Sequence, residues 1–235
     1  KDDKFCDKMN DYILFKNLDG KYLTLPECLE ENKEKHENTI FYVTDEVQQG
    51  QYIRMFKEEG TDAVILKHNI DQPFITHLEQ KNEGVKFLRI DAELNDTFKE
   101  EVSEDDKKSL EEDQKSLAET FKKALNNENL ELKLEKLKDE KISSMVTLSE
   151  ESRRMQDMMK MYGMDPSMFG SKLTLVLNAN HPLVQYILEN KDSENVPMMC
   201  EQLYDLAVIS HEQLSPEAMT KFIERTNKIM ELLVK

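Results

Sequence analysis

The sequence predicts a mixed α/β protein: a small three-strand parallel βαβ unit, followed by an α+β domain with a three-strand sheet and a terminal helical hairpin. Three patterns lead to this fold class. Short β-rich runs alternate with amphipathic stretches over residues 39–91. Three more β-rich runs follow residue 127, and two strongly apolar helical patterns close the chain. Because parallel strands need long crossover connections, the strand–helix alternation indicates right-handed βαβ units whose helices cover the sheet.

The first unit begins with a predicted hairpin. Residues 12–29 alternate apolar and polar side chains around Asp19-Gly20, a pair that favours a tight turn. Further along, Gly60 fits the end of a helix. After the hairpin we expect strands and helices in alternation, at 39–43, 45–59, 62–66, 71–80 and 86–90.

A change of composition marks the middle of the chain. Acidic residues dominate from residue 95 to 119, and Ser103 can cap a helix there. The few apolar positions of that helix are Leu110, Leu117, Phe121 and Leu125. A polar helix at a composition shift is typical of a domain boundary, and its charges are most simply a solvated face. We therefore expect a first unit, a connecting helix and a second domain, with the bounds 1–100, 101–126 and 127–235.

The second domain has its own strands and helix starts. Strands are expected near 130–134, 143–148 and 172–177, and helices at about 182–188, 197–211 and 216–234. Ser149 fits the cap of a methionine-rich helix, and Asn180 or His181 fits the cap before Pro182. The triplet Ser215-Pro216-Glu217 combines a cap, a first-turn proline and a first-turn acid, which strongly predicts a helix start.

Seven of the 13 methionines fall between residues 145 and 168. If residues 151–162 are helical, one stripe contains Met155, Met158, Met159 and Tyr162. Thioether side chains are flexible and polarizable, so such a stripe suits a surface that accepts partners of many shapes. The alternative is an ordinary core stripe. Partial exposure is favoured because three further methionines lie off the stripe, namely Met161, Met164 and Met168.

The two terminal helices are unusually apolar. The last one keeps a helical spacing of i, i+3, i+4 and i+7 over Met219, Phe222, Ile223, Thr226, Ile229, Met230 and Leu233, and the preceding one has little polar face. A helical hairpin beside a three-strand sheet has too little domain around it to cover both helices. Pairing with a second copy into a dimeric four-helix bundle would cover them. The alternative is packing on the chain's own sheet.

Composition restricts the class of partner. A net charge of −16 opposes binding to nucleic acid or an anionic membrane. The sequence contains no run of about 18 apolar residues and no signal peptide at its start. The lack of an initiating methionine suggests a piece of a longer protein. Three widely spaced cysteines predict reduced thiols of a cytosolic protein, at Cys6, Cys28 and Cys200.

The patterns of a catalytic site are missing from the sequence. The first strand-to-helix turn, residues 43–50, has neither a dinucleotide fingerprint nor a phosphate loop, and Thr44 or Asp45 is more simply a helix cap. The five histidines lack metal-ligand spacing. We therefore expect no enzyme, no catalytic residue, no metal and no cofactor in this chain. A small nucleotide- or redox-dependent enzyme remains an alternative supported only by the βαβ alternation.

Four segments together resemble the ninety-kilodalton heat-shock protein (Hsp90) chaperone family, and its bacterial members most closely. They are IFYVTDE (40–46), IDQPFITHLEQKNEGVKFLRID (70–91), MVTLSEESRRMQDMMKMYG (145–163) and LNANHPLV (177–184). They occur in family order over essentially the whole chain. The Asn-x-x-His-Pro segment at 178–182 is the most specific of these features.

The resemblance implies a place in a longer protein. Residues 1–100 would be the distal part of the middle domain and 127–235 the C-terminal dimerisation domain. The family's ATP site and catalytic arginine would precede Lys1, so that ATP and magnesium belong to the full-length parent. The resemblance thus implies a chaperone fragment of a bacterial cytoplasmic heat-shock protein, which acts in the stress response and protein folding. The chain ends without the acidic tail that binds helical-repeat co-chaperones, so no such partner is expected.

The resemblance also assigns residues to two surfaces. The client-binding set for unfolded or partly folded proteins would be Arg154, Met155, Met158, Met159, Met161 and Tyr162. The homodimer interface would contain Leu203, Leu206, Phe222, Ile223, Ile229 and Leu233. The alternative is a purely structural dimerisation module in which the methionine window is buried as core.

Overall fold

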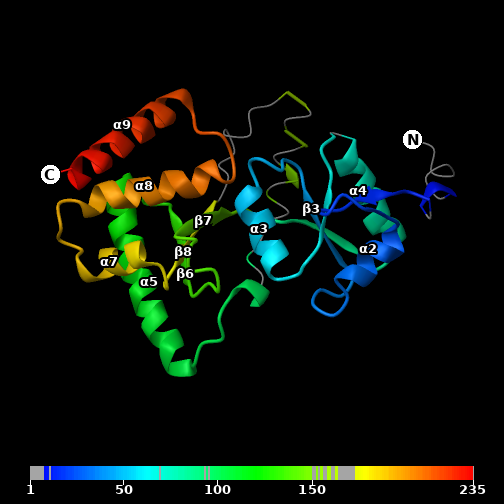
Figure 1. Ribbon diagram of the computed structural model, residues 1–235, viewed down its shortest axis with the longest axis horizontal. Helices are drawn as coiled ribbons and strands as arrows, with labels where there is room; N and C mark the ends of the chain where they lie inside the picture. The colour runs from blue at the N-terminus through cyan, green and yellow to red at the C-terminus, as the bar shows by residue number, and fades with distance from the viewer. Residues whose placement is uncertain are drawn as a thin grey trace. The chain divides into compact units, whose positions relative to one another are not determined.

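The computed structural model describes residues 8–10, 12–68, 70–92, 94, 96–149, 152, 154–155, 158–159, 162–163 and 173–234 (Figure 1). The chain divides into two compact units, Lys1–Ala92 and Glu93–Lys235. Each unit has its own three-strand sheet and its own core. The predicted mixed α/β fold class is confirmed, including the small parallel sheet.

The parallel sheet of the first unit has the order β4-β3-β5. β3 (Thr39–Val43) lies in the centre and pairs in parallel with β4 (Ala63–Ile65) and β5 (Lys86–Arg89). The connections are α3 (Gly50–Glu58) and α4 (Asp71–Lys81). Both faces of β3 are covered, as a parallel sheet requires. Tyr42 shares a core with Ile75 of α4, while Phe41 meets Phe56 of α3 edge-on with ring centroids 4.9 Å apart.

The predicted hairpin is confirmed in its first half only. β1 (Phe15–Lys16) and β2 (Tyr22–Leu23) pair antiparallel across a turn in which Gly20 has a φ of +81°. The expectation that the alternation continues to residue 29 is wrong, because α2 (Leu25–Glu31) begins immediately after β2. Thr24 and Glu27 form a capping box: the Glu27 carboxylate accepts a hydrogen bond from the Thr24 backbone N–H at 2.7 Å.

The sheet of the second unit has the order β6-β8-β7. β8 (Thr174–Asn178) runs parallel to β6 (Glu131–Glu135) and antiparallel to β7 (Ser144–Thr147). A short 3-10 helix (Asp96–Phe98) precedes the other helices of the unit, which are α5 (Glu104–Leu125), α7 (Pro182–Glu189), α8 (Val196–Ile209) and α9 (Pro216–Leu233). The predicted helix starts are confirmed by cap hydrogen bonds at Ser103, His181 and Ser215.

α5 is part of the second unit rather than a connector. Leu117 and Phe121 are fully buried in the same core as β6 and α8. The structure divides its two units after Ala92. The helix expected at 101–126 as a connector with a solvated charged face is instead part of the second unit. The four large apolar residues of α5 recur at i, i+7, i+11 and i+15, which lie on one narrow face. Composition alone conceals such a face, because the helix has many more polar residues than apolar ones.

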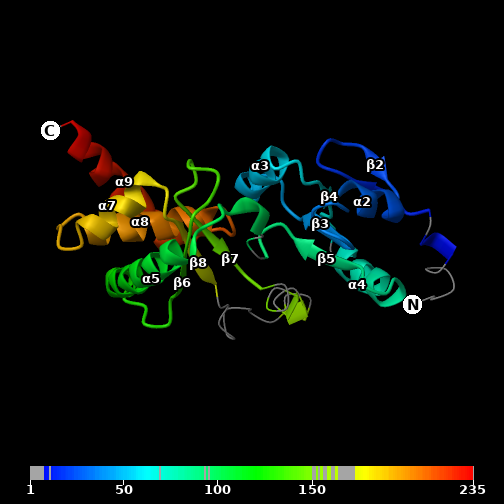
Figure 2. The same cartoon turned by 90° about the horizontal axis from the view of Figure 1, so that it is seen from below.

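α8 and α9 have opposite environments. α8 lies between α9 and the sheet (Figures 1 and 2) and buries six residues, among them Cys200 and Leu203. The Ser144 hydroxyl of β7 donates a hydrogen bond to the Leu203 carbonyl at 2.8 Å. α9 is 18 residues long and buries none of them. α8 thus packs on the chain's own sheet, whereas α9 lies against α8 with no fully buried residue.

The Asn-x-x-His-Pro segment has a structural role, which comes from the hydrogen bonds of its first residue, Asn178. Its fully buried side chain accepts hydrogen bonds from the backbone N–H groups of Leu137 and Asn180, both at 3.1 Å. Its amide donates to the carbonyls of Asp139 and Ile142 at 3.1 and 2.8 Å. One side chain therefore satisfies four backbone groups where β8 ends, and it fixes the loop between β6 and β7.

Candidate interaction surfaces

The methionine-rich helix begins where the sequence predicts. The Ser149 hydroxyl accepts a hydrogen bond from the Ser152 backbone N–H at 3.2 Å. Among the described residues, 152, 154, 155, 158 and 159 are helical. At the end, the Tyr162 N–H donates to the carbonyls of Met158 and Met159.

The predicted stripe divides between surface and interior. Met155, Met158 and Tyr162 are 49%, 51% and 74% exposed, whereas Met159 is only 8% exposed. The exposed three recur at i, i+3 and i+7 and share one face, which we call the methionine surface. Met159 therefore leaves the predicted contacting set, because its side chain contributes to the core.

The other predicted members have different positions. Arg154 is half-buried on the same helix. Met161 lies outside the described residues, as do the off-stripe residues Met164 and Met168. Met145, at the start of the same window, is fully buried in β7. The methionine window therefore supplies both core residues and exposed residues.

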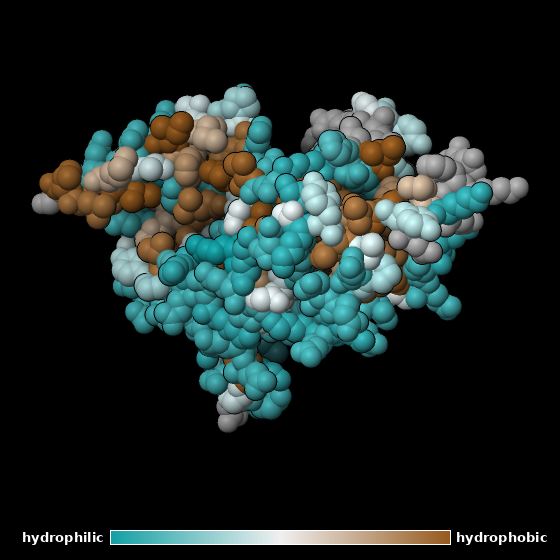
Figure 3. Space-filling view, turned by 45° about the vertical axis from the view of Figure 1, so that its right-hand side comes forward, coloured by the Kyte–Doolittle hydropathy of each residue, from teal (hydrophilic) through white to brown (hydrophobic). Residues whose placement is uncertain are grey.

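α9 has two apolar faces at helical spacing. Ala218, Phe222 and Ile229 are half-buried and recur with Arg225 at i, i+4, i+7 and i+11, on the side toward α8. A second set is exposed and recurs at i, i+4, i+11 and i+14; we call it the α9 stripe, and it consists of Met219, Ile223, Met230 and Leu233. Figure 3 shows apolar surface along these C-terminal helices, at the left of the view.

The predicted dimer residues fall into three groups. Leu203 is 1% exposed and belongs to the core of its own unit, so it is not available at a surface. Phe222 and Ile229 are half-buried on the α8 side of α9. The exposed members are Leu206, Ile223 and Leu233. Met219 and Met230, which were not in the predicted set, are also exposed on the α9 stripe.

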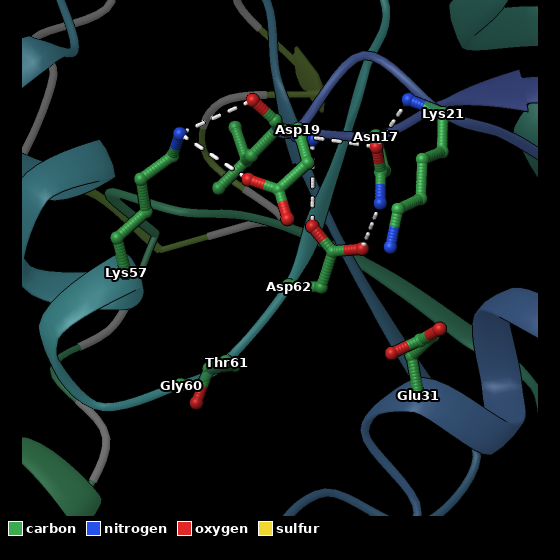
Figure 4. A pocket seen from close by; sticks show the side chains of 9 residues that line it. Asn17, Asp19, Lys21, Glu31, Lys57, Gly60, Thr61 and Asp62 are labelled. Carbon is green, nitrogen blue, oxygen red and sulfur yellow. Dashed lines mark hydrogen bonds and ion pairs between the residues drawn. The ribbon is translucent and has the colours of Figure 1, made fainter.

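A polar cavity of about 270 Å³ lies beside the Asp19-Gly20 turn (Figure 4). The Asn17 amide donates to the Asp62 carboxylate at 2.8 Å, and the Asn17 amide oxygen accepts from the N–H groups of Asp19 and Lys21. The Lys57 ammonium donates to the Leu18 carbonyl at 3.2 Å. These bonds join the turn to the residue that precedes β4 and to α3. The arrangement braces a loop and contains no nucleophile–base pair.

The turn after β3 does not fit a phosphate. The Gln49 side-chain oxygen accepts hydrogen bonds from the N–H groups of Thr44 and Asp45, at 2.8 and 3.1 Å. The Asp45 carboxylate accepts from the N–H groups of Val47 and Gln48 in the same turn. Four backbone donors of this turn are therefore satisfied by its own side chains and are not available to an anion.

The buried thiols of Cys28 and Cys200 have low reactivity, because their pKa values are raised. Burial raises the pKa of the Cys28 thiol to about 12, with a further contribution from the Asp62 charge. Burial likewise raises the pKa of the Cys200 thiol to about 12. Within the part of the chain that the structure describes, no three His, Cys, Asp or Glu side chains are grouped to hold a metal ion. Among the same residues, no helix is both long enough and apolar enough to cross a membrane.

The family model described as "Hsp90 protein" matches residues 1–235. The chain belongs to the Hsp90 family. Its match to this family confirms the resemblance seen in the four sequence segments. The two apolar surfaces are therefore surfaces of an Hsp90 protein.

Curated relatives are similar along most of the chain. The chaperone protein HtpG of Bacteroides fragilis (strain YCH46) is 32% identical over 207 residues, which cover 81% of this chain and 29% of the relative. HtpG of Porphyromonas gingivalis (strain ATCC 33277) is 26% identical over 228 residues, covering 90% of this chain and 32% of the relative. HtpG of Treponema denticola is 30% identical, covering 83% and 31%. The chain spans less than a third of the length of these relatives.

The expectation that the chain is not an enzyme is corrected by these matches. The Hsp90 model covers the whole chain and the HtpG chaperones cover most of it, so catalytic motifs missing from this stretch do not exclude an enzyme. That expectation rested on motifs missing from this stretch and on a resemblance that placed the family's ATP site before Lys1.

Proposed function

We propose that this chain is part of an ATP-dependent chaperone of the HtpG type, acting in the bacterial cytoplasm with ATP and magnesium as cofactors of the whole protein. The first unit would be the distal part of the middle domain and the second unit the dimerisation domain. Family membership and the similarity to HtpG chaperones support the proposal. It extends to two roles for this chain: binding unfolded proteins and joining two copies.

The observation that carries the client-binding role is the exposure of Met155, Met158 and Tyr162 on one helix face. Exposed thioethers beside an aromatic ring offer contact area to apolar segments of differing shape. The surrounding chain is strongly charged, with a net charge of −16. Such charge keeps the protein soluble while a small apolar patch remains available.

The dimer role is supported by α9. An amphipathic helix normally buries its apolar face, yet the α9 stripe is exposed in the single chain. Two α8-α9 hairpins related by a twofold axis would bury both stripes in a four-helix bundle. Joined in this way, the remaining domains of two copies act at a high effective concentration.

The client role is tested with the double variant Met155→Ser, Met158→Ser. We expect it to lose most protection of a chemically unfolded model protein against aggregation, measured by light scattering, with an unchanged unfolding midpoint. Val47→Ser is the matched control, since Val47 is also exposed but lies in the first unit. Full protection by the double variant would contradict the client role.

A purely structural dimerisation module is the second candidate. The burial of Met145 and Met159 favours it, because part of the methionine window does serve as core. Under this candidate, the double variant and the Val47→Ser control would behave alike in the aggregation assay, while the dimer would persist in both.

A further inference from the structure

Apolar burial fixes the position of α9 on its own chain only in part, through half-buried residues such as Phe222 and Ile229. None of its residues is buried, and among the described residues no α9 side chain joins or packs against the core of the second unit. α9 nevertheless lies against α8 along a defined face. Polar contacts between the two helices therefore have a large part in fixing its position.

These contacts converge on Arg225. Its Nε donates to Glu201 Oε2 at 2.9 Å, and its Nη1 donates to Gln202 Oε1 at 3.2 Å and to Asp205 Oδ2 at 2.8 Å. We call these four residues the Arg225 clamp. The acceptors lie at i, i+1 and i+4 of α8, on one side of that helix. Only 10% of the Arg225 side chain and 12% of the Asp205 side chain are exposed.

One more hydrogen bond extends the clamp along α9. The Gln202 amide donates to the Thr226 hydroxyl at 3.1 Å, so Gln202 contacts two successive residues of α9. Arg225 and Thr226 together fix both the rotation of α9 about its axis and its position along α8. Apolar contacts alone specify neither as sharply, because they are not directional.

We propose that Arg225 is a positioning residue that sets the rotation of α9 so that the α9 stripe faces a second copy of the chain. Successive helix residues are about 100° apart, so a modest rotation of α9 would turn the stripe out of a shared seam. This inference rests on the proposed dimer. In this proposal the clamp sets the rotation of α9, which the apolar residues of the seam cannot set because their contacts are not directional.

The chemistry of the clamp fits positioning better than stabilisation. A mostly buried ion pair contributes little net stability, since desolvation offsets the attraction, but it can specify register. A planar guanidinium reaches three acceptors at fixed angles, which an ammonium group cannot do. The clamp therefore preorganises a surface before a partner arrives.

Sedimentation equilibrium of Arg225→Met tests the proposal. We expect the dimer dissociation constant to rise by about tenfold or more, as for the loss of a preorganising contact. The dissociation constant of Arg225→Lys should lie between those of Arg225→Met and the wild type. Lys221→Met is the matched control, because it removes one positive charge from an exposed position of the same helix. It should leave the dissociation constant unchanged.

The unfolding midpoint separates positioning from a structural role. In the monomeric Ile223→Glu background, the double variant Arg225→Met, Asp205→Leu should leave the midpoint within about 2 °C, because replacing both partners of a mostly buried ion pair with apolar side chains is nearly neutral for stability. A large fall there would overturn the positioning role. If Arg225→Met is too unstable to study, Asp205→Asn removes one ionic contact, and an unchanged dimer in that variant would also overturn it.

The outcomes for the dimer itself are distinct. A wild-type chain that stays monomeric at high concentration would reject the proposed dimer, and the positioning role with it. A wild-type dimer that Arg225→Met leaves intact would reject the positioning role alone. Weakening by Arg225→Met with no effect of Lys221→Met is the result that supports the proposal.

Discussion

Met158 and Met159 are neighbours in sequence, yet their side chains are 51% and 8% exposed. They lie about 100° apart around one helix turn, so the backbone directs one outward and the other into the core. The helix therefore divides its methionines between packing and surface. A role in client binding can be assigned to Met158 without involving Met159.

Replacing these two residues singly should separate stability from binding. Met159→Ser should lower the free energy of unfolding by about 2–4 kcal/mol, because it leaves a cavity and buries a hydroxyl group. Met158→Ser should change it by less than about 0.5 kcal/mol, as is usual at an exposed position. Urea denaturation followed by circular dichroism measures both, and equal losses would contradict the division.

Substitutions of Leu203 and Leu206 on α8 should likewise separate an effect on stability from an effect on binding. Leu203 is part of the core, so Leu203→Ala should cost about 2–5 kcal/mol of stability. Leu206 is exposed, and Leu206→Ala should weaken the dimer while stability measured in the Ile223→Glu monomer stays nearly constant. A dimer unaffected by Leu206→Ala would place the seam elsewhere on α8.

Asn178 should be essential for the loop between β6 and β7. Asn178→Ala removes the partners of four backbone groups, of which at least those of Leu137 and Ile142 are bonded in buried surroundings. We expect a loss of about 2–4 kcal/mol, because buried groups left unsatisfied carry a desolvation cost. Asn129→Ala, at an exposed position, is the control for denaturant unfolding. A loss no larger than in that control would refute the structural role of Asn178.

The two buried thiols should resist modification. A pKa of about 12 instead of 9.0 reduces the thiolate fraction at pH 8 about a thousandfold, and burial also blocks access. In a Cys6→Ser variant, we expect an aromatic disulfide reagent to react with Cys28 and Cys200 only after urea is added. Rapid reaction of either thiol in the folded protein would show that its site is open.

The same thiols predict a dependence of stability on pH. Folding raises their pKa, so the folded state holds these protons more tightly than the unfolded state. Their contribution to stability is complete below about pH 9 and is lost as the pH rises toward 12. Replacing both thiols with Ala should flatten the alkaline part of a stability curve measured by urea denaturation.

Local signals in the sequence predicted much of the fold. The βαβ order follows from strand and helix periodicities that are short-range, and Ser103, Ser149 and Ser215 cap helices through hydrogen bonds within three residues. The Asp19-Gly20 turn is equally local. α2 was missed because apolar alternation concealed the Thr24–Glu27 capping box.

The surfaces could be predicted only in part. Periodicity shows that a helix has an apolar face, but not what covers that face. It could not reveal that Leu203 meets the chain's own sheet or that Phe222 faces α8, since both depend on tertiary packing. The Arg225 clamp was missed for the same reason: its acceptors lie 20 to 24 residues away in sequence.

The central claim is that the α9 stripe is covered by a second copy of the chain. Sedimentation equilibrium of the wild type and of Ile223→Glu, over a micromolar concentration series, tests it most directly. We predict twice the single-chain mass for the wild type and the single-chain mass for Ile223→Glu, because the variant places a charge in an apolar seam. Lys221→Glu, a larger charge change outside the stripe, should remain dimeric. A wild-type monomer throughout the series, or an Ile223→Glu variant as dimeric as the wild type, would contradict the account.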